Sequence, residues 1–307
     1  MRNEMIRCLE GLAEADPDVM LVTGDLGFGV LTRFSARFPR QFINAGVAEQ
    51  NMTGLAVGMA LEGKTVFTYS IGNFPTLRCL EQIRNDACYH NANVKIVCVG
   101  GGFTYGSLGI SHHATEDLAI LRALPDITVI APGDPVEAAA ATRAVYDTPG
   151  TCYLRLGRGG EPRIHAGSVD FRVGKAIRLF EGEDVAILST GGILKVAHDA
   201  REKLVASGLR VGLFSMHTVK PIDLELVMEL AGAVRLIVTL EEHTVIGGLG
   251  GAVAEIVAQM PGPKADLEVI GLRDCFSSVV GDQEYLRSVY GLTADDVVSR
   301  VGARLVP

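Results

Sequence analysis

The sequence predicts an α/β protein of two doubly wound domains, each a parallel sheet covered by helices on both faces. Short continuous apolar runs, such as residues 19–23 and 94–99, alternate with segments whose apolar residues follow helical spacing. The alternation stops across a Gly, Pro and charged stretch at residues 159–170 and resumes near residue 185. A length of 307 residues agrees with two domains.

The first domain is expected at residues 1–160 and opens with a helix that precedes a strand ending at Gly24-Asp25. Two prolines, Pro125 and Pro132, end a helix and a strand further on. Strands are expected at residues 19–23, 42–45, 65–69, 94–99, 127–130 and 152–156. Helices are expected at residues 3–15, from Glu49 to about Gly63, and at 77–88, 116–124 and 135–146.

A linker at residues 161–183 is expected to lead to a smaller α/β domain at residues 184–307. The elements expected there are a strand from Val185, a helix at 194–207, a strand at 211–216, the segment 220–223, a strand at 236–240 and a helix at 250–259. Ligands of parallel sheets bind at the carboxyl ends of the strands. The loops at residues 24–25, 45–49, 69–74 and 100–113 should therefore form one crevice.

Composition excludes several classes of protein. The net charge is −8, and no basic run suggests nucleic-acid binding. No apolar run reaches the ~18 residues of a membrane span, and the first residues lack the apolar core of a signal peptide. The six cysteines are scattered without a Cys-x-x-Cys pair, which favours reduced thiols in the cytoplasm over disulfides or a metal site.

The most informative segment is Gly-Val-Ala-Glu-Gln-Asn-Met at residues 46–52, followed by an apolar helix rich in Gly and Ala. It places the carboxylate of Glu49 at the mouth of a buried helix. Burying an unpaired carboxylate costs several kcal/mol. Glu49 therefore either pairs within the chain or serves a ligand.

Residues 44–52 resemble the pyrimidine-binding motif of thiamine-diphosphate enzymes, and nearly the whole chain resembles the C-terminal section of transketolase. The matching segments, in order, are Arg2, 23–26, 44–52, 74–76, 81–84, 111–113, 125–134, 154–158, 241–243 and 247–250. The resemblance implies a pyrimidine-binding domain followed by a transketolase C-terminal domain. It also implies thiamine diphosphate as cofactor.

One part of the family pattern is missing. Such enzymes bind Mg²⁺ and the diphosphate through Gly-Asp-Gly followed about 30 residues later by Asn, since this hard cation prefers oxygen ligands. The Gly-Asp pairs at residues 24–25, 133–134 and 281–282 are not followed by Gly. The resemblance therefore implies one subunit of a split transketolase, inactive alone. A separate diphosphate-binding subunit would supply the Mg²⁺ ligands in an α2β2 assembly.

The resemblance also implies roles for cofactor-binding residues. Glu49 would bond the pyrimidine ring nitrogen and promote the imino tautomer, and Phe74 would support the ring. Asp25 would lie near the thiazolium, and Tyr69 would assist. From the residues alone, Asp25 equally fits an Asx turn, and aromatic residues near a strand are usually part of the core.

A second group of roles concerns substrate. His112 matches a histidine that faces substrate and moves protons, with His113 as its adjacent rival. Arg158 and Arg2, with Arg155 as a further candidate, match arginines that bind the sugar phosphate. Solvated arginines and a structural histidine are the ordinary alternatives.

The segment 100–110 departs from the family pattern. Gly100 stands where many transketolases have a phosphate-side histidine, and Leu108 stands where they have an aspartate that reads a sugar hydroxyl. This loop is rich in glycine and uncharged. The departures favour a specialised or less hydroxylated ketose over the usual pentose phosphates.

The function that we expect is transfer of a two-carbon ketol unit from a ketose to an aldose. The alternatives are the β subunit of a 2-oxo acid dehydrogenase E1 component, a deoxyxylulose-phosphate-synthase-like condensing enzyme, and a noncatalytic scaffold. The sequence Ser-His-His-Ala-Thr-Glu-Asp-Leu at residues 111–118 and Leu-Gly-Arg-Gly at 156–159 favour transketolase.

Overall fold

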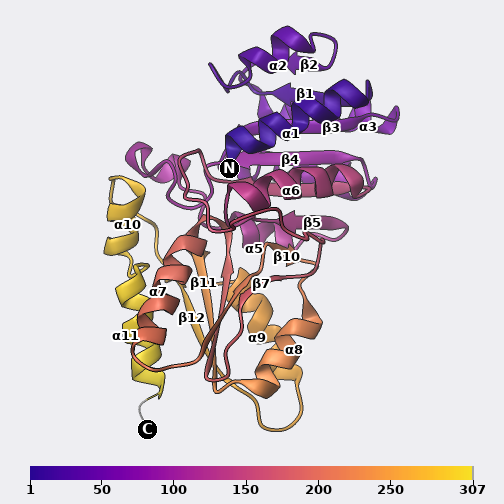
Figure 1. Ribbon diagram of the computed structural model, residues 1–307. Coiled ribbons are helices and arrows are strands. Elements are labelled where there is room, and N and C mark those ends of the chain that lie inside the picture. Colours follow the sequence, from indigo (N-terminus) through magenta and orange to yellow (C-terminus); the bar gives the residue numbers. More distant parts are fainter. Residues whose placement is uncertain (306–307) are drawn as a thin grey trace.

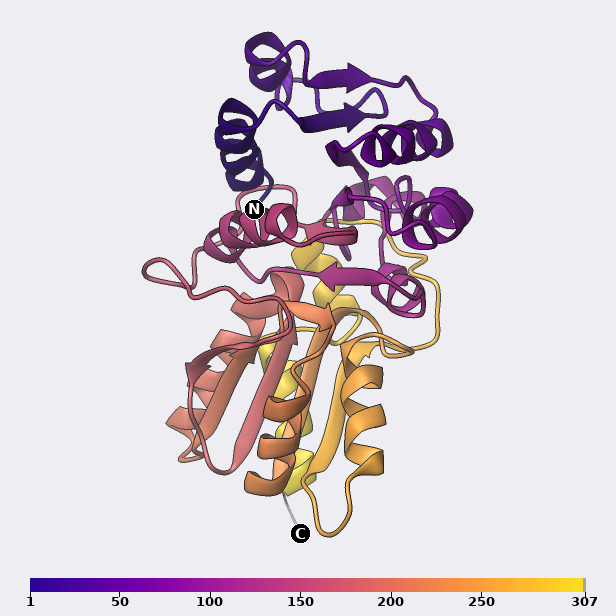
Figure 2. The same ribbon diagram turned by 90° about the vertical axis from the view of Figure 1, so that its right-hand side faces the viewer.

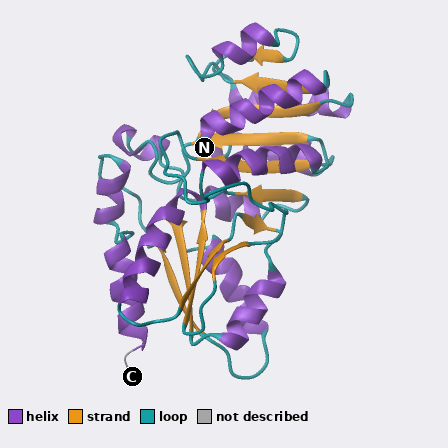
Figure 3. Ribbon diagram, viewed as in Figure 1, coloured by secondary structure: helices purple, strands orange, loops and turns teal. Residues whose placement is uncertain are grey.

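The computed structural model describes residues 1–305, which fold into two α/β units, each built on one sheet (Figure 1). Within those residues the first sheet has seven strands in the order β10-β5-β6-β4-β3-β1-β2, and the second has five in the order β12-β11-β8-β9-β7. The predicted fold class is confirmed. Strands and helices alternate in layers, with the sheets between helices (Figure 3).

The strands of the first sheet are β1 (Val19–Thr23), β2 (Phe42–Asn44), β3 (Thr65–Ile71), β4 (Val94–Val99), β5 (Ile127–Ile130), β6 (Thr151–Leu156) and β10 (Thr218–Lys220). Those of the second are β7 (Ile177–Phe180), β8 (Val185–Thr190), β9 (Val211–Ser215), β11 (Leu236–Thr244) and β12 (Asp266–Leu272). Strands β1, β4, β6 and β8 are buried along their whole length. Burial on both faces explains why they appear as continuous apolar runs.

The α-helices are α1 (Arg2–Ala15), α2 (Thr32–Arg37), α3 (Glu49–Leu61), α4 (Leu80–Gln82), α5 (Asp117–Arg122), α6 (Pro135–Asp147), α7 (Leu194–Ala206), α8 (Leu224–Ala233), α9 (Leu249–Gln259), α10 (Gln283–Val289) and α11 (Ala294–Leu305). On the first sheet, α1 and α6 share one core, and α3 and α5 belong to the core on the other face. On the second sheet, α7 and α11 pack on one face and α8 and α9 on the other (Figure 2).

The helix predicted at residues 77–88 is not continuous. It consists of a 3₁₀ turn at Leu77–Cys79, the single turn of α4, and a π-helical segment at Ile83–Cys88. π-Helical turns are rare and frequently lie at functional sites. Here the irregular segment follows Phe74, so it borders the crevice expected from the sequence.

Two segments differ from the expected division of the chain. Residues 177–180, expected in the linker, form β7 and pair antiparallel with β9. Residues 218–220, which follow β9, leave the second sheet as β10 and pair antiparallel with β5 of the first sheet. The two sheets are therefore connected by an exchanged strand as well as by the linker.

Surface features agree with a chain that carries no membrane segment in its described part. No helix within residues 1–305 combines the length and the apolar composition needed to cross a bilayer. All six cysteines lie in this part as free thiols, five of them at least partly buried, and Cys275 is exposed.

Candidate active site

The candidate site lies where β1, β3, β4 and β6 of the first sheet end, as the sequence predicts. Glu49 begins α3, Phe74 follows β3, and His112 ends a 3₁₀ turn at Ile110–His112 in the loop after β4. Arg158 follows β6, and Arg2 begins α1. These side chains form a row of contacts that begins at Glu49 and ends at the arginines.

Glu49 is nearly inaccessible, with 3% of its surface exposed. Nη1 of Arg78 lies 2.7 Å from its Oε2. Within residues 1–305 this is the one hydrogen bond to the carboxylate, so Oε1 is left for a ligand. Gly24 permits the close packing, because a Cβ there would lie 3.2 Å from Cγ of Glu49.

Phe74 lies next to this ion pair. The guanidinium carbon of Arg78 is 4.5 Å from the centroid of the Phe74 ring, and the ring of His112 meets Phe74 edge-on at 5.2 Å. Sequence reasoning missed Arg78. The need of a buried carboxylate for a partner was the available signal, but spacing alone could not choose between Arg78 and Arg84.

The structure separates His112 from His113. His113 is buried, with Nδ1 2.5 Å from Oγ of Ser277 and Nε2 3.1 Å from the carbonyl oxygen of Gly106. His112 is half-buried, and its Nδ1 lies 3.0 Å from Oγ of Ser111. Burial lowers the pKa of His112, and the charge of His113 lowers it further. A largely neutral imidazole can accept a proton at neutral pH.

Asp25 adopts a left-handed backbone conformation with φ of 57°. The side chain of Asn44 holds it, since Nδ2 donates to Oδ1 of Asp25 at 2.9 Å and Oδ1 accepts from the backbone N–H of Asp25 at 3.0 Å. These bonds fix the loop after β1 beside the loop that leads to Glu49.

The opposite end of the row is cationic. Arg158 is exposed, and its guanidinium carbon lies 5.8 Å from the centroid of the Tyr105 ring. Arg2 lies beside the hydroxyls of Tyr69 and Tyr105, and its charge opposes the rise in pKa that burial gives to both phenols. Tyr69 is 3% exposed and faces Arg2, which argues against its expected contact with the pyrimidine.

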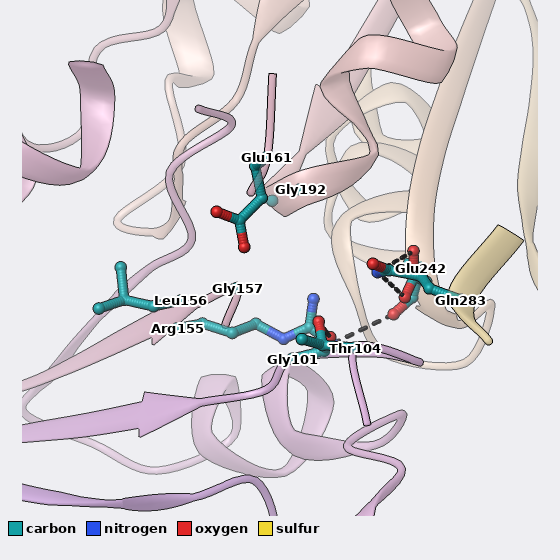
Figure 4. A pocket seen from close by; sticks show the side chains of 10 residues that line it. Gly101, Thr104, Arg155, Leu156, Gly157, Glu161, Gly192, Glu242 and Gln283 are labelled. Atoms are coloured by element: carbon teal, nitrogen blue, oxygen red, sulfur yellow. Dashed lines mark hydrogen bonds between the residues drawn. The ribbon is translucent and has the colours of Figure 1, made fainter. Parts of the chain in front are cut away.

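Arg155 does not join this group. It is 4% exposed, its Nε lies 2.8 Å from Oδ2 of the buried Asp117, and its Nη2 donates to the carbonyl oxygens of Ala114 and Glu242. The cavity beside it has a volume of ≈ 20 Å³ (Figure 4), room for about one water. The expectation that Arg155 binds substrate is therefore corrected, since it joins the two domains.

The residues that remain fit the pyrimidine half of thiamine diphosphate. A buried carboxylate with one free oxygen suits a ring nitrogen, and the Phe74 face suits a planar heteroaromatic ring. The described residues contain no group of three or more His, Cys, Asp or Glu arranged to bind a metal ion. Fold and site thus define the class: a two-domain α/β protein with a site for half of a cofactor.

Comparisons with known proteins identify this class. The family "Transketolase, pyrimidine binding domain" matches residues 1–161, and "Transketolase, C-terminal domain" matches residues 174–297. The chain belongs to the transketolase family, whose members depend on thiamine diphosphate.

Relatives include components of split transketolases. One of the two kinds of chain named for the apulose-4-phosphate transketolase of Phocaeicola vulgatus is 34% identical over 97% of this chain and 97% of its own. The 6-deoxy-6-sulfo-D-fructose transketolase subunit SqwH of Clostridium sp. (strain MSTE9) is 37% identical over 97% and 92%. A solved structure described as a split gene transketolase, inactive beta4 tetramer, matches with a TM-score of 0.89 at 37% identity, covering 99% and 97%. These relatives favour transketolase over the E1 component.

Proposed function

We propose that this chain is the pyrimidine-binding subunit of a split transketolase that transfers a two-carbon ketol unit between sugars. The observation that carries the proposal is the buried carboxylate of Glu49 beside Phe74 and His112. A scaffold would have no need of a carboxylate with 3% exposure at the mouth of a crevice.

The residues divide the chemistry between them. Thiamine diphosphate, when bound, supplies the nucleophilic carbon that carries the ketol unit. Glu49 holds a proton at the pyrimidine nitrogen and so sets the tautomer, while Phe74 supports the ring and excludes water. His112 exchanges protons with the carbonyl and hydroxyl oxygens of the sugar. Asp25, held by Asn44, supplies negative charge beside the thiazolium.

The partner that we propose is a diphosphate-binding subunit, with two copies of each chain in a heterotetramer. It would supply the Mg²⁺ ligands, because this chain has no Gly-Asp-Gly motif. Helix α3 offers a docking face. The helix is apolar, yet Gly54, Leu55, Gly58 and Leu61 are exposed along one side. A helix that is apolar all round belongs in an interior. We expect the assembly to be cytoplasmic, in keeping with its free thiols.

The substrates that we propose are sugars with an anionic end, phosphorylated or otherwise specialised. Arg2 and Arg158 provide positive charge at the end of the row that lies away from Glu49. Leu108 is 54% exposed, so the loop 100–110 offers no carboxylate to read a sugar hydroxyl. Relatives named for apulose 4-phosphate and for a sulfonated fructose agree with a specialised substrate.

Reconstitution tests the proposal. The chain is mixed with the candidate diphosphate-binding chain, thiamine diphosphate and Mg²⁺, and ketol transfer from a panel of ketose phosphates is followed. We expect turnover only in the mixture, and Glu49→Gln should lower it by several orders of magnitude. Unchanged turnover with Glu49→Gln would support the scaffold hypothesis instead.

A further inference from the structure

The loop after β4 has an aromatic side chain where the family pattern has a histidine. Gly100 has φ of 103°, and a Cβ at this position would overlap the ring carbons of Tyr105. The ring thus occupies the space that a side chain at position 100 would need. Gly100 and Tyr105 therefore act as a pair, because the glycine makes room for the ring.

Tyr105 also links the two ends of the candidate site. Its ring centroid lies 6.3 Å from that of His112 and 5.8 Å from the guanidinium carbon of Arg158. Burial raises the pKa of its hydroxyl, and the charges of Arg2 and Arg158 oppose that rise. A phenol keeps its proton at neutral pH in this setting and can donate it in a hydrogen bond.

We propose that Tyr105 determines substrate specificity: its ring sets the spacing between His112 and the arginines, and its hydroxyl donates to the terminal oxyanion of the sugar. This inference rests on the proposed function and deepens it. Arg2 and Arg158 neutralise the charge, and Tyr105 adds a directed hydrogen bond. The ligand chemistry is a tetrahedral oxyanion, which either a phosphate or a sulfonate presents.

The geometry also says what the site does not select. Residues 100–110 carry no charged side chain, so the middle of the sugar meets an aromatic ring and a glycine-rich backbone. Discrimination should therefore depend on the anionic end and on the length of chain between it and the carbonyl. The hydroxyl pattern between them should matter less.

The experiment compares Tyr105→Phe with the wild type in the reconstituted complex. The acceptors are glyceraldehyde 3-phosphate, the three-carbon aldehyde with a terminal sulfonate, and glyceraldehyde. We expect KM for the anionic acceptor to rise about tenfold with kcat nearly unchanged, because one hydrogen bond to a charged group is lost. KM for glyceraldehyde should change less than twofold. The anionic acceptor with the larger change identifies the oxyanion.

Tyr146→Phe is the matched control, because the Tyr146 hydroxyl bonds Asp16 on the outer face of α1 and α6. Equal KM values for Tyr105→Phe and wild type on all acceptors would overturn the inference. So would an equal loss with the neutral acceptor, which would make Tyr105 merely structural.

Binding of inorganic phosphate to the free chain, measured by calorimetry, separates this inference from the proposed function. Weaker phosphate binding by Tyr105→Phe supports the oxyanion site even where the complex shows no turnover. Turnover by the wild type with phosphate binding unaffected by the variant would overturn the inference and leave the proposed function intact.

Discussion

Arg78 contacts both side chains that we assign to the pyrimidine ring. Its Nη1 lies 2.7 Å from Oε2 of Glu49, and its guanidinium carbon lies 4.5 Å from the Phe74 centroid. A planar cation thus lies on the aromatic face that the cofactor ring needs. The arginine is 47% exposed, so water can take its place when the side chain turns outward.

Removing this arginine should destabilise the free chain. Arg78→Gln leaves the carboxylate of Glu49 without a charged partner, and we expect the free energy of unfolding to fall by about 1 kcal/mol, since one partner is half exposed. Urea denaturation measures this. In the Glu49→Gln background the same change should cost much less. The control is Arg84→Gln, whose arginine bonds the exposed Asn85. Equal effects in both backgrounds would contradict the pairing.

Two nearby arginines should respond in opposite ways. Arg155→Met leaves the fully buried Asp117 without its cation, and we expect a loss of about 3 kcal/mol in unfolding free energy. Arg158→Met removes an exposed side chain, so stability should change by less than about 0.5 kcal/mol. In the reconstituted complex Arg158→Met should raise KM for a sugar phosphate. A stable Arg155→Met protein with raised KM would restore Arg155 to the substrate site.

The linker is anchored by a cluster that responds to pH. Nδ1 of His165 lies 3.1 Å from Oδ2 of Asp134, and its Nε2 lies 3.5 Å from Oε1 of Glu137. Burial raises the pKa of Glu137 to about 7. Burial also acts to lower the pKa of His165, but Asp134 and Glu137 hold it above its usual value. Nearby His217 has its pKa lowered to about 3 by burial.

The sign of the pH dependence follows from these shifts. Glu137 and His165 bind protons more tightly in the folded chain, so their contributions are lost as pH rises through their folded pKa values. His217 acts in the opposite direction, but only below its unfolded value of 6.5. Between pH 6.5 and 8 we therefore expect stability to fall by about 1 kcal/mol. Urea midpoints at the two pH values should converge in Glu137→Gln and not in the exposed control Glu62→Gln. A rise in wild-type stability would contradict this.

The docking face of α3 makes a further prediction. Gly54 has open space around its Cα, so Gly54→Phe should fold with an unchanged melting temperature. The added ring should block close approach of the partner chain and abolish the complex in size-exclusion chromatography. Gly302→Phe on α11 also enters open space and is the matched control. A complex of normal size with Gly54→Phe would place the partner elsewhere.

The sequence predicted those elements whose local pattern and burial agree. Buried strands such as β4 and β8 and the helix from Glu49 were found because apolar runs and helical spacing are local signals. The 3-residue β10 was missed as a strand because its pairing with β5 joins residues 88 or more positions apart, which no local pattern encodes.

The site shows the same limit. Residues with a motif of their own, such as Glu49 and His112, could be selected from the sequence. Arg155 and Arg158 look alike in sequence, and only Asp117, from another helix, shows that Arg155 is buried. Tyr105 had no signal beyond its neighbours, since its importance comes from the space above Gly100.

The exchange of β10 affects what could happen if the domains were separated. Cutting the chain in the linker would remove β10 from the first sheet and expose the backbone N–H and C=O groups of β5. An uncovered edge strand pairs readily with other chains. The first domain made alone should therefore aggregate. Gene fission, domain shuffling and protein engineering in this architecture would then be confined to breakpoints that keep both domains on one polypeptide.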